Sequence, residues 1–389
     1  MKAVVWHGKE DVRVDNVPDP VIQEPTDAIV RVTSTAICGS DLHLYSKLSP
    51  IMREGDIVGH EPMGIVEEVG RDVTHIQPGD RVVVPFNISC GHCYFCNEQL
   101  YSQCETTRDR GKLAEAASLL GRGRGASLFG YTHVYGAVPG GQAEYLRVPQ
   151  AHFGPIKVPE GPPDERFLFL SDVLPTSWQA VAYADVPEDG TLGIWGLGPI
   201  GQMSARIAYH LGAGRVIGVD NVPERLTLAA KYGVETVDFS AVDDVKELVL
   251  EMTGGRGVDA AIDAVGMEAS GSLIDSLLQT TKVQLDKAYA LRQRIASIRR
   301  GGTLSISGVY AGPIQMFPLG DLFDMQIQVR QGQANVRRWV DDIMTLLNDD
   351  DPLGTEDLKT HEMSLEDAPL GYEIFQKKQD GAIKCVLKA

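Results

Sequence analysis

The sequence lacks any hydrophobic run long enough to cross a membrane. The bilayer core requires roughly 18–20 consecutive apolar residues, and no stretch of the 389 residues approaches that length. The first residues, MKAVVWHGKEDVRV, alternate apolar and polar positions as in a strand, a turn and a second strand. This pattern differs from a secretory signal peptide. We therefore expect a cytoplasmic protein without a membrane partner.

Positive charge is also in short supply. The 36 lysines and arginines are outnumbered by 53 aspartates and glutamates, which gives a net charge of −17 at pH 7. Nucleic acids and anionic membranes bind basic surfaces, so we expect neither as a partner. The composition, with 43% hydrophobic residues, is that of an ordinary globular protein. A chain of this length is longer than most domains built on a single hydrophobic core, so we predict two domains.

Cysteine is scarce, with six in the chain, but four of the six lie close together. Residues 90–104 read CGHCYFCNEQLYSQC, a C-x2-C-x2-C-x7-C spacing. Four thiolates this close repel one another unless a cation neutralises them, and tetrahedral zinc is the usual ion. An iron–sulfur cluster, whose common bacterial run ends in C-x3-C-P, and unligated thiols are the alternatives. The pattern favours a structural zinc in a reducing compartment, held by Cys90, Cys93, Cys96 and Cys104.

A glycine-rich turn follows a predicted buried strand at 192–195. Thr191–Gly201 reads TLGIWGLGPIG and leads into a helical apolar pattern over 200–211 and a second strand at 215–219 that ends at Asp220. A G-x-G-x-x-G turn in this context binds the pyrophosphate of a dinucleotide at the helix N-terminus, and the following acid binds a ribose. NAD is favoured over NADP because Asp220 repels a 2′-phosphate. A glycine-rich turn without a ligand is the alternative.

Two kinds of pattern divide the chain. Residues 1–148 contain short alternating segments between glycine and proline breaks, which predict a small barrel or sandwich. From residue 191 to about 331, strands and helices alternate, which predicts a doubly wound parallel sheet. Strands are expected at 192–195, 215–219, 236–239, 258–264, 303–307 and 326–330, and helices at 200–211, 223–232, 243–253, 283–300 and 338–347. The polar segment 105–132 is an insertion, either a lid over a cleft or a tolerated surface loop.

A further motif begins at Gly59. Residues 59–73 read GHEPMGIVEEVGRDV and match the pattern G-H-E-x2-G-x5-G-x2-V. Cys38 precedes this motif, and the four-cysteine segment and the glycine-rich turn follow it. In this order of motifs the whole chain resembles the zinc-containing alcohol dehydrogenases of the medium-chain dehydrogenase/reductase superfamily. The segments LSDVLPTSWQA, GGQAEYLRVP and ISGVYAGP are similar to the glutathione-independent formaldehyde dehydrogenase-like branch.

The resemblance implies an α/β protein with two domains. Residues 1–174 would form a β-rich GroES-like catalytic domain that includes the zinc lobe at 90–104 and the insertion at 105–132. Residues 175–335 would form a Rossmann domain, a doubly wound parallel sheet that binds the coenzyme. Residues 336–389 would return to the catalytic domain. The resemblance also implies a homodimer or homotetramer.

The resemblance also implies a catalytic zinc site. Cys38, His60 and Asp172 would hold the ion, and Glu61 would lie near it, either as an occasional ligand or in contact with the ligands. Many relatives carry a cysteine at the position of Asp172, so this acid is a departure from the common pattern.

The cofactor site is implied in the same way. Asp220 and Arg225 match positions that bind the adenosine ribose, and Lys384 matches a position near the pyrophosphate. The other implied cofactor contacts are Gly196, Gly198, Pro199, Ile200, Gly201, Val265, Gly308 and Val309.

The chemistry of alcohol oxidation is consistent with these residues. Hydride transfer from an alcohol requires loss of its hydroxyl proton, and an open zinc site makes that proton more acidic. Ser40 would take the proton and His43 would pass it outward through the cofactor ribose, while the nicotinamide accepts the hydride. We predict an enzyme with two zinc ions and NAD that oxidises a small alcohol or an aldehyde hydrate such as that of formaldehyde. A polyol or longer-chain alcohol dehydrogenase, and a protein that binds NAD and zinc without turnover, are the alternatives.

Overall fold

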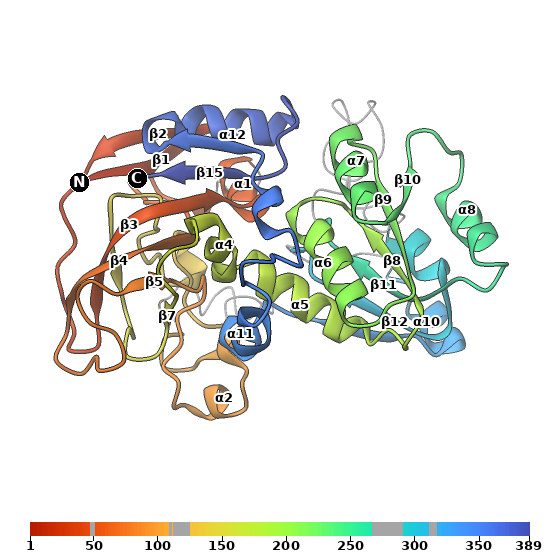
Figure 1. The fold of residues 1–389 in the computed structure, drawn as a ribbon, viewed down its shortest axis with the longest axis horizontal. Coiled ribbons are helices and arrows are strands. Elements are labelled where there is room, and N and C mark those ends of the chain that lie inside the picture. The colour runs from red at the N-terminus through yellow and green to blue at the C-terminus, as the bar shows by residue number, and fades with distance from the viewer. Residues whose placement is uncertain (47–50, 109–110, 112–124, 267–290, 311–316) are drawn as a thin grey trace. The chain divides into compact units, whose positions relative to one another are not determined.

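The computed structural model describes residues 1–46, 51–108, 111, 125–266, 291–310 and 317–389 (Figure 1). The chain divides into two compact units. The first unit contains Met1–Pro175 and Ala334–Ala389, and the second contains Thr176–Gln333. The chain therefore leaves the first unit once and returns to it. Most of the insertion expected at 105–132 lies outside the described residues. Its assignment as a lid or as a surface loop stays a prediction.

The first unit is built on a seven-stranded sheet. Its strand order is β14-β15-β3-β4-β5-β7, and β6 also pairs with β3. Neighbouring strands run antiparallel except for the parallel pair β14 and β15. The strands of this unit are β1 (Lys2–Gly8), β2 (Asp11–Asn16), β3 (Ala28–Ile37), β4 (Glu61–Val69), β5 (Arg81–Val83), β6 (Tyr145–Val148), β7 (Ile156–Lys157), β14 (His361–Ser364) and β15 (Cys385–Lys388).

Short helices connect and cover these strands. Helix α5 (Val173–Ala184) continues from the first unit into the second. The other helices among the described residues of the first unit are α1 (Gly39–Ser46), α2 (Tyr94–Asn97), α4 (Asp164–Leu168), α11 (Val336–Met344) and α12 (Ala368–Lys377), with 3-10 turns at Tyr101–Gln103, His133–Tyr135, Phe169–Ser171, Thr355–Leu358 and Leu365–Asp367. Within the described parts of the chain, no helix is both long and apolar enough to span a bilayer.

The C-terminal strand brings the end of the chain beside the β3–α1 junction. Cys385 of β15 pairs with Ile37 of β3, and Val386 pairs with Ala36. These residues are fully buried, as expected for a central strand between two neighbours. This pairing places Lys384 next to the turn that carries Cys38.

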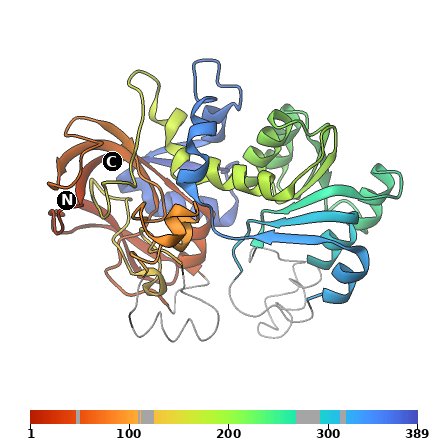
Figure 2. The ribbon, with the colours of Figure 1, turned by 90° about the horizontal axis from the view of Figure 1, so that it is seen from below.

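The second unit contains a six-stranded parallel sheet in the order β10-β9-β8-β11-β12-β13. In chain order this is 3-2-1-4-5-6, the arrangement of a Rossmann sheet. Helices drawn in green lie along one side of the sheet in Figure 2. The elements are β8 (Thr191–Trp195), α6 (Pro199–His210), β9 (Arg215–Asp220), α7 (Pro223–Lys231), β10 (Glu235–Asp238), α8 (Val245–Met252), β11 (Val258–Asp263), β12 (Ile298–Ile306), α10 (Leu319–Met325) and β13 (Gln328–Gln331).

The helix predicted over 283–300 is wrong at its C-terminal end. Helical structure ends at residue 296, and β12 begins at Ile298. Ile298 pairs with Val258 of β11 and is 1% exposed. The apolar residue at this position continued the helical spacing from Ile295, but it is buried by a neighbouring strand. The part of this segment before residue 291 lies outside the described residues.

An ion pair between buried Arg81 and partly buried Asp164 holds helix α4 against the seven-stranded sheet. Asp164 accepts a 2.6 Å hydrogen bond from Nη2 of Arg81, whose side chain is 7% exposed. The second carboxylate oxygen of Asp164 accepts hydrogen bonds from the hydroxyls of Thr33 and Ser34, at 2.6 and 2.7 Å. Burial raises the pKa of Asp164, but these three donors outweigh it and lower the pKa below its usual value.

We expect Asp164→Ala to destabilise the protein by about 3 kcal/mol, because Arg81 then stays buried without a counter-charge. Glu67→Ala is the matched control, since Glu67 pairs with Arg31 where both side chains are nearly half exposed. Loss of such a surface pair costs at most about 1 kcal/mol. Thermal unfolding of both variants measures the difference. Equal shifts in Tm would contradict this role for Asp164.

Candidate functional site

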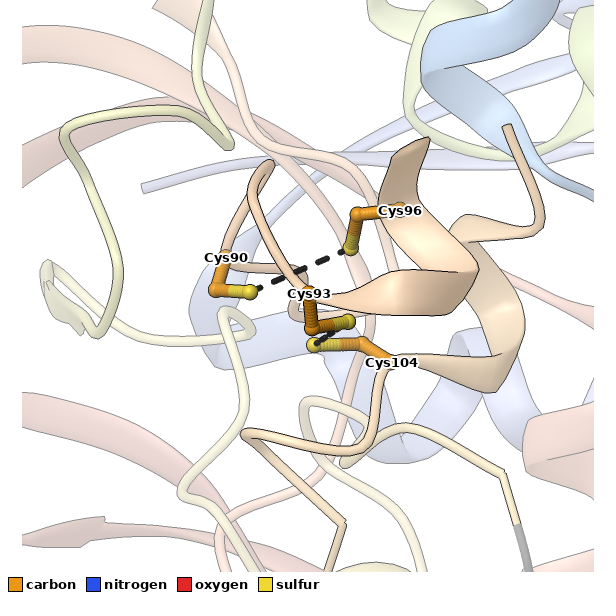
Figure 3. A group of neighbouring side chains, drawn as sticks. All are labelled: Cys90, Cys93, Cys96 and Cys104. Carbon is orange, nitrogen blue, oxygen red and sulfur yellow. Dashed lines mark hydrogen bonds between the residues drawn. The ribbon is translucent and has the colours of Figure 1, made fainter. Parts of the chain in front are cut away.

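The four clustered cysteines converge in space (Figure 3). Cys90 and Cys93 lie on the loop before α2, Cys96 lies in α2, and Cys104 follows the 3-10 turn at Tyr101–Gln103. The Sγ–Sγ distances are 4.0 Å for Cys90 and Cys96 and 3.9 Å for Cys93 and Cys104. All four thiols are free of disulfides.

These distances suit a single tetrahedral ion. Zinc–sulfur bonds of 2.3 Å at tetrahedral angles separate the sulfurs by about 3.8 Å. An iron–sulfur cluster places several iron and sulfide atoms between its cysteines and would hold them further apart. The four thiols therefore fit one zinc ion and do not fit a cluster.

A second group of four donors lies elsewhere in the first unit. Cys38, His60, Glu61 and Asp172 each present one atom within 4.8 Å of the others. Cys38 lies between β3 and α1, His60 and Glu61 lie where β4 begins, and Asp172 directly precedes α5. Oδ2 of Asp172 is 3.5 Å from both Cys38 Sγ and His60 Nε2. A zinc ion with one sulfur, one nitrogen and one oxygen ligand separates these atoms by about 3.4–3.6 Å.

The charges around this group also suit a cation. Burial, followed by the nearby Glu61 and Asp172 carboxylates, raises the pKa of the Cys38 thiol to about 11. Burial lowers the pKa of His60, but the surrounding acidic groups, Asp41 first, raise it well above its usual value. This donor group therefore stabilises positive charge at its centre. A metal ion supplies that charge and lets Cys38 act as a thiolate ligand.

Asp41 is a site residue that the sequence analysis missed. Its Oδ1 lies 3.0 Å from His60 Nδ1, and its side chain is fully buried. Its Oδ2 accepts a 2.9 Å hydrogen bond from the backbone N–H of Cys38. A metal-binding histidine almost always donates its second ring N–H to such an acceptor, which leaves Nε2 for the metal. The signal was a carboxylate three residues after the candidate ligand Cys38.

Ser40 and His43 lie near the same donors. Ser40 Oγ is 3.2 Å from His60 Nε2. His43 is three residues further along α1, and residues at this spacing share a helix face. His43 is 5% exposed. The two side chains therefore lie on one face of α1, and Ser40 is the one that contacts the donor group.

The structure gives Lys384 a neighbour that the sequence analysis did not anticipate. Its ammonium lies 2.6 Å from Glu61 Oε1, and both side chains are fully buried. Burial lowers the pKa of Lys384, but Glu61, with Cys38 and Asp172, raises it above its usual value. Glu61 Oε2 is also buried and has no hydrogen-bond partner among the described residues. Contact between Lys384 and a pyrophosphate stays a prediction.

The glycine-rich turn joins β8 to α6 in the second unit. Gly196 has φ +93°, and a Cβ on Gly201 would lie 1.9 Å from the Gly196 carbonyl oxygen. Both positions therefore require glycine. Gly198 precedes Pro199, the first residue of α6, and no side chain caps this helix N-terminus. Its backbone N–H groups are suited to bind an anionic group.

Asp220 lies at the end of β9, beside this turn. Its Oδ2 accepts a 2.7 Å hydrogen bond from the N–H of Leu197. Its Oδ1 accepts from the N–H groups of Asn221 and Val222, at 2.7 and 3.0 Å. Arg225 Nη1 is 3.6 Å from Oδ2. The carboxylate thus joins the glycine-rich turn to the start of α7, and the two candidate ribose-binding side chains lie together.

The other candidate cofactor residues occupy turns at the same ends of neighbouring strands. Val265 follows β11, and its methyl group would lie 2.6 Å from a Cβ placed on Gly196. Gly308 and Val309 follow β12, and a Cβ on Gly308 would lie 2.2 Å from the N atom of Gly266. Ligands of parallel sheets bind at these carboxyl ends. The candidate residues of the second unit therefore lie together at the carboxyl ends of the strands of its sheet.

Comparison with known proteins identifies the family. The family described as "Alcohol dehydrogenase GroES-like domain" matches residues 24–160, and "Zinc-binding dehydrogenase" matches residues 199–284. An uncharacterized zinc-type alcohol dehydrogenase-like protein of Bacillus subtilis is 42% identical over 391 residues, with 100% of both chains covered. The chain belongs to the zinc-type alcohol dehydrogenases. The predicted superfamily is thereby confirmed.

Two further similarities concern the branch and the fold of this zinc-type alcohol dehydrogenase. A glutathione-independent formaldehyde dehydrogenase of Pseudomonas aeruginosa is 33% identical over 398 residues, and the match covers 96% of this chain and 94% of that protein. The solved structure of alcohol dehydrogenase TADH from Thermus sp. ATN1 has a TM-score of 0.82 at 34% identity, covering 100% and 99% of the two chains. The predicted combination of a GroES-like domain and a Rossmann sheet is confirmed.

We expect Cys93→Ser to remove one zinc ion per chain from this zinc-type alcohol dehydrogenase and to lower its Tm. The variant loses one of four thiolates, and a structural zinc contributes directly to folding. Cys385→Ser is the control, because Cys385 is a buried strand residue outside both donor groups. Metal analysis of the purified proteins measures the zinc content. Unchanged zinc in Cys93→Ser would contradict a metal site at these cysteines.

Proposed function

We propose that this protein is an NAD-dependent zinc dehydrogenase that oxidises a small alcohol or an aldehyde hydrate, with formaldehyde hydrate as the leading candidate. The donor group of Cys38, His60, Glu61 and Asp172 carries the proposal, because these are metal-binding atoms at metal-binding separations. Similarity to the Pseudomonas formaldehyde dehydrogenase supports the choice of substrate. The four-cysteine group would hold a second, structural zinc ion.

Bound zinc would polarise the substrate oxygen, and bound NAD would accept the hydride. The protein supplies the arrangement of donors and the proton path. Asp41 holds the ring of His60 so that Nε2 faces the donor group. Lys384 holds one oxygen of Glu61 and leaves the second oxygen, Oε2, available within the same group.

The hydroxyl of Ser40 is the first proton acceptor in this proposal. It lies beside His60 Nε2, where the substrate oxygen would bind, and it can pass a proton on as it receives one. His43 is the next group on the same face of α1. One ring nitrogen of a neutral imidazole accepts a proton while the other donates one, so His43 is suited to carry the proton outward.

Cofactor choice rests on Asp220 in the second unit. A carboxylate at the end of the second strand binds ribose hydroxyls and repels a 2′-phosphate. We infer a preference for NAD over NADP. We also propose a cytoplasmic location, since free thiols at both donor groups suit a reducing compartment. The family resemblance suggests a homodimer or homotetramer.

A panel of substrates tests the proposed reaction. The zinc-loaded protein is incubated with NAD and with formaldehyde, short primary alcohols, longer alcohols and polyols, and NADH formation is followed by absorbance. We expect the highest kcat/KM with formaldehyde or a short primary alcohol. Cys38→Ala should retain the fold and show no turnover. NADH formation with polyols alone would contradict the proposed substrate, and no NADH formation with any compound would contradict the proposed enzyme.

Substitution of Asp220 tests the cofactor assignment. Asp220→Asn keeps oxygen as an acceptor but removes the negative charge, so NADP should bind more tightly and the preference for NAD should narrow. Asp220→Ala removes the acceptor as well, which should weaken NAD binding by about 10-fold or more, as for a lost hydrogen bond to a charged group. Titration of NADH fluorescence measures both affinities. A wild-type preference for NADP would contradict the assignment.

A further inference from the structure

A buried chain of hydrogen bonds lies behind the Asp41–His60 pair. We propose that Gln142 and Tyr372 are positioning residues that fix the carboxylate of Asp41 and, through it, the metal-facing orientation of His60. The inference rests on the proposed catalytic zinc site. It assigns a role to Gln142, which belongs to the GGQAEYLRVP segment and takes no part in the proposed proton path or donor group.

Gln142 is fully buried and uses its amide on three partners. Its Nε2 donates to Asp41 Oδ2 at 3.3 Å and to the backbone carbonyl of Ala36 at 3.2 Å. Its Oε1 accepts a 2.9 Å hydrogen bond from the hydroxyl of Tyr372 in α12. Both donor hydrogens and one acceptor site of the amide are therefore occupied.

These partners fix the orientation of the amide. A flipped Gln142 would place its oxygen against Asp41 Oδ2 and the Ala36 carbonyl, which are both acceptors. It would also place its NH2 group against the hydroxyl of Tyr372. Burial, followed by the nearby Asp41 carboxylate, raises the pKa of Tyr372 well above its usual value, so its hydroxyl stays protonated and donates. The two acceptors, Asp41 Oδ2 and the Ala36 carbonyl, thus determine which end of the amide faces Asp41, and the hydroxyl of Tyr372 holds the amide oxygen in place.

The backbone of Gln142 is held beside the histidine segment. Its N–H donates to the Val58 carbonyl at 3.1 Å, and the N–H of Gly141 donates to the Gly59 carbonyl at 2.8 Å. Gly59 has φ +94°, and a Cβ at this residue would lie 2.3 Å from Gln142 Cγ. The glycine before His60 therefore provides the space in which the Gln142 side chain reaches Asp41.

Asp41 depends on this contact because its other donors fix it only in part. Cys38 N–H and Gln142 Nε2 both donate to Oδ2, while Oδ1 faces His60. Removing the amide leaves Oδ2 with the single backbone donor. The buried carboxylate is then held less firmly, and so is the oxygen that faces the ring of His60. Loss of a partner that contacts a metal ligand directly, as Asp41 contacts His60, typically weakens metal binding by 10–100-fold.

The test compares zinc release from four variants of the zinc-loaded protein. Gln142→Leu removes the amide, and Tyr372→Phe removes only the hydroxyl. Gln179→Leu and Tyr209→Phe are matched controls in the second unit, where these side chains donate to the carbonyls of residues 332 and 333 and of Gly233, respectively. A chromophoric chelator follows the release of both zinc ions over time. Cobalt-substituted protein reports the ligand geometry through its visible absorption.

We expect Gln142→Leu to release one zinc ion per chain about 10-fold faster than wild type, at the lower end of the range for a direct partner of a ligand. The second ion should leave at the wild-type rate. Tyr372→Phe should show a smaller acceleration of the same ion, and both variants should change the cobalt spectrum. The two controls should match wild type in both measurements.

Two results would overturn the inference. Wild-type release rates and cobalt spectra in both Gln142→Leu and Tyr372→Phe would show that Asp41 is fixed without them. Equal acceleration of both zinc ions would show a general loosening of the fold. If Gln142→Leu does not fold, Tyr372→Phe decides, because it keeps the aromatic ring in place. Wild type that binds only one zinc ion would instead contradict the proposed function, and with it this inference.

Discussion

Buried acidic donors without a balancing charge are the constraint on which the first unit depends. One such group consists of Cys38, Glu61 and Asp172 beside His60. The other consists of the four thiols of Cys90, Cys93, Cys96 and Cys104. Acidic groups this close repel one another when ionised, and burial increases the cost. A cation at each group relieves both effects. The ion pair of Lys384 and Glu61 supplies only part of the compensation at the first group.

The second unit depends on a different constraint, the close approach of backbone segments. Gly201 contacts the Gly196 carbonyl, and Gly308 contacts Gly266. Asp263 strengthens the second contact, because its Oδ1 accepts hydrogen bonds from the N–H groups of Val265 and Gly266, at 3.0 and 3.2 Å. The glycines at these positions have no room for a Cβ, and a nucleotide would lie against the main chain beside them. The candidate metal sites of the first unit are thus characterised by clustered acidic groups, and the candidate nucleotide site of the second unit by closely approaching backbone segments.

Spacing over a few residues of the sequence was enough to predict the features that are built from neighbouring residues. The cysteine spacing gave a compact group of four thiols, and the strand–glycine–helix pattern gave the β8–α6 turn. The contacts that it missed join distant positions: Asp41 and Gln142 are 101 residues apart, Gln142 and Tyr372 are 230 apart, and Glu61 and Lys384 are 323 apart. No periodicity relates such residues. The error at Ile298 has a similar cause, because an apolar residue at helical spacing is buried equally well by a sheet.

A crystallographic map of anomalous scattering, recorded on both sides of the zinc absorption edge, tests the central claim most directly. Two zinc peaks per chain are predicted in the untreated protein. One should lie among Cys38 Sγ, His60 Nε2 and a carboxylate oxygen of Asp172, and the other should lie at the centre of the four-cysteine lobe. Both peaks should vanish below the edge. A single peak, or no peak at the Cys38 group in fully zinc-loaded crystals, would contradict the account.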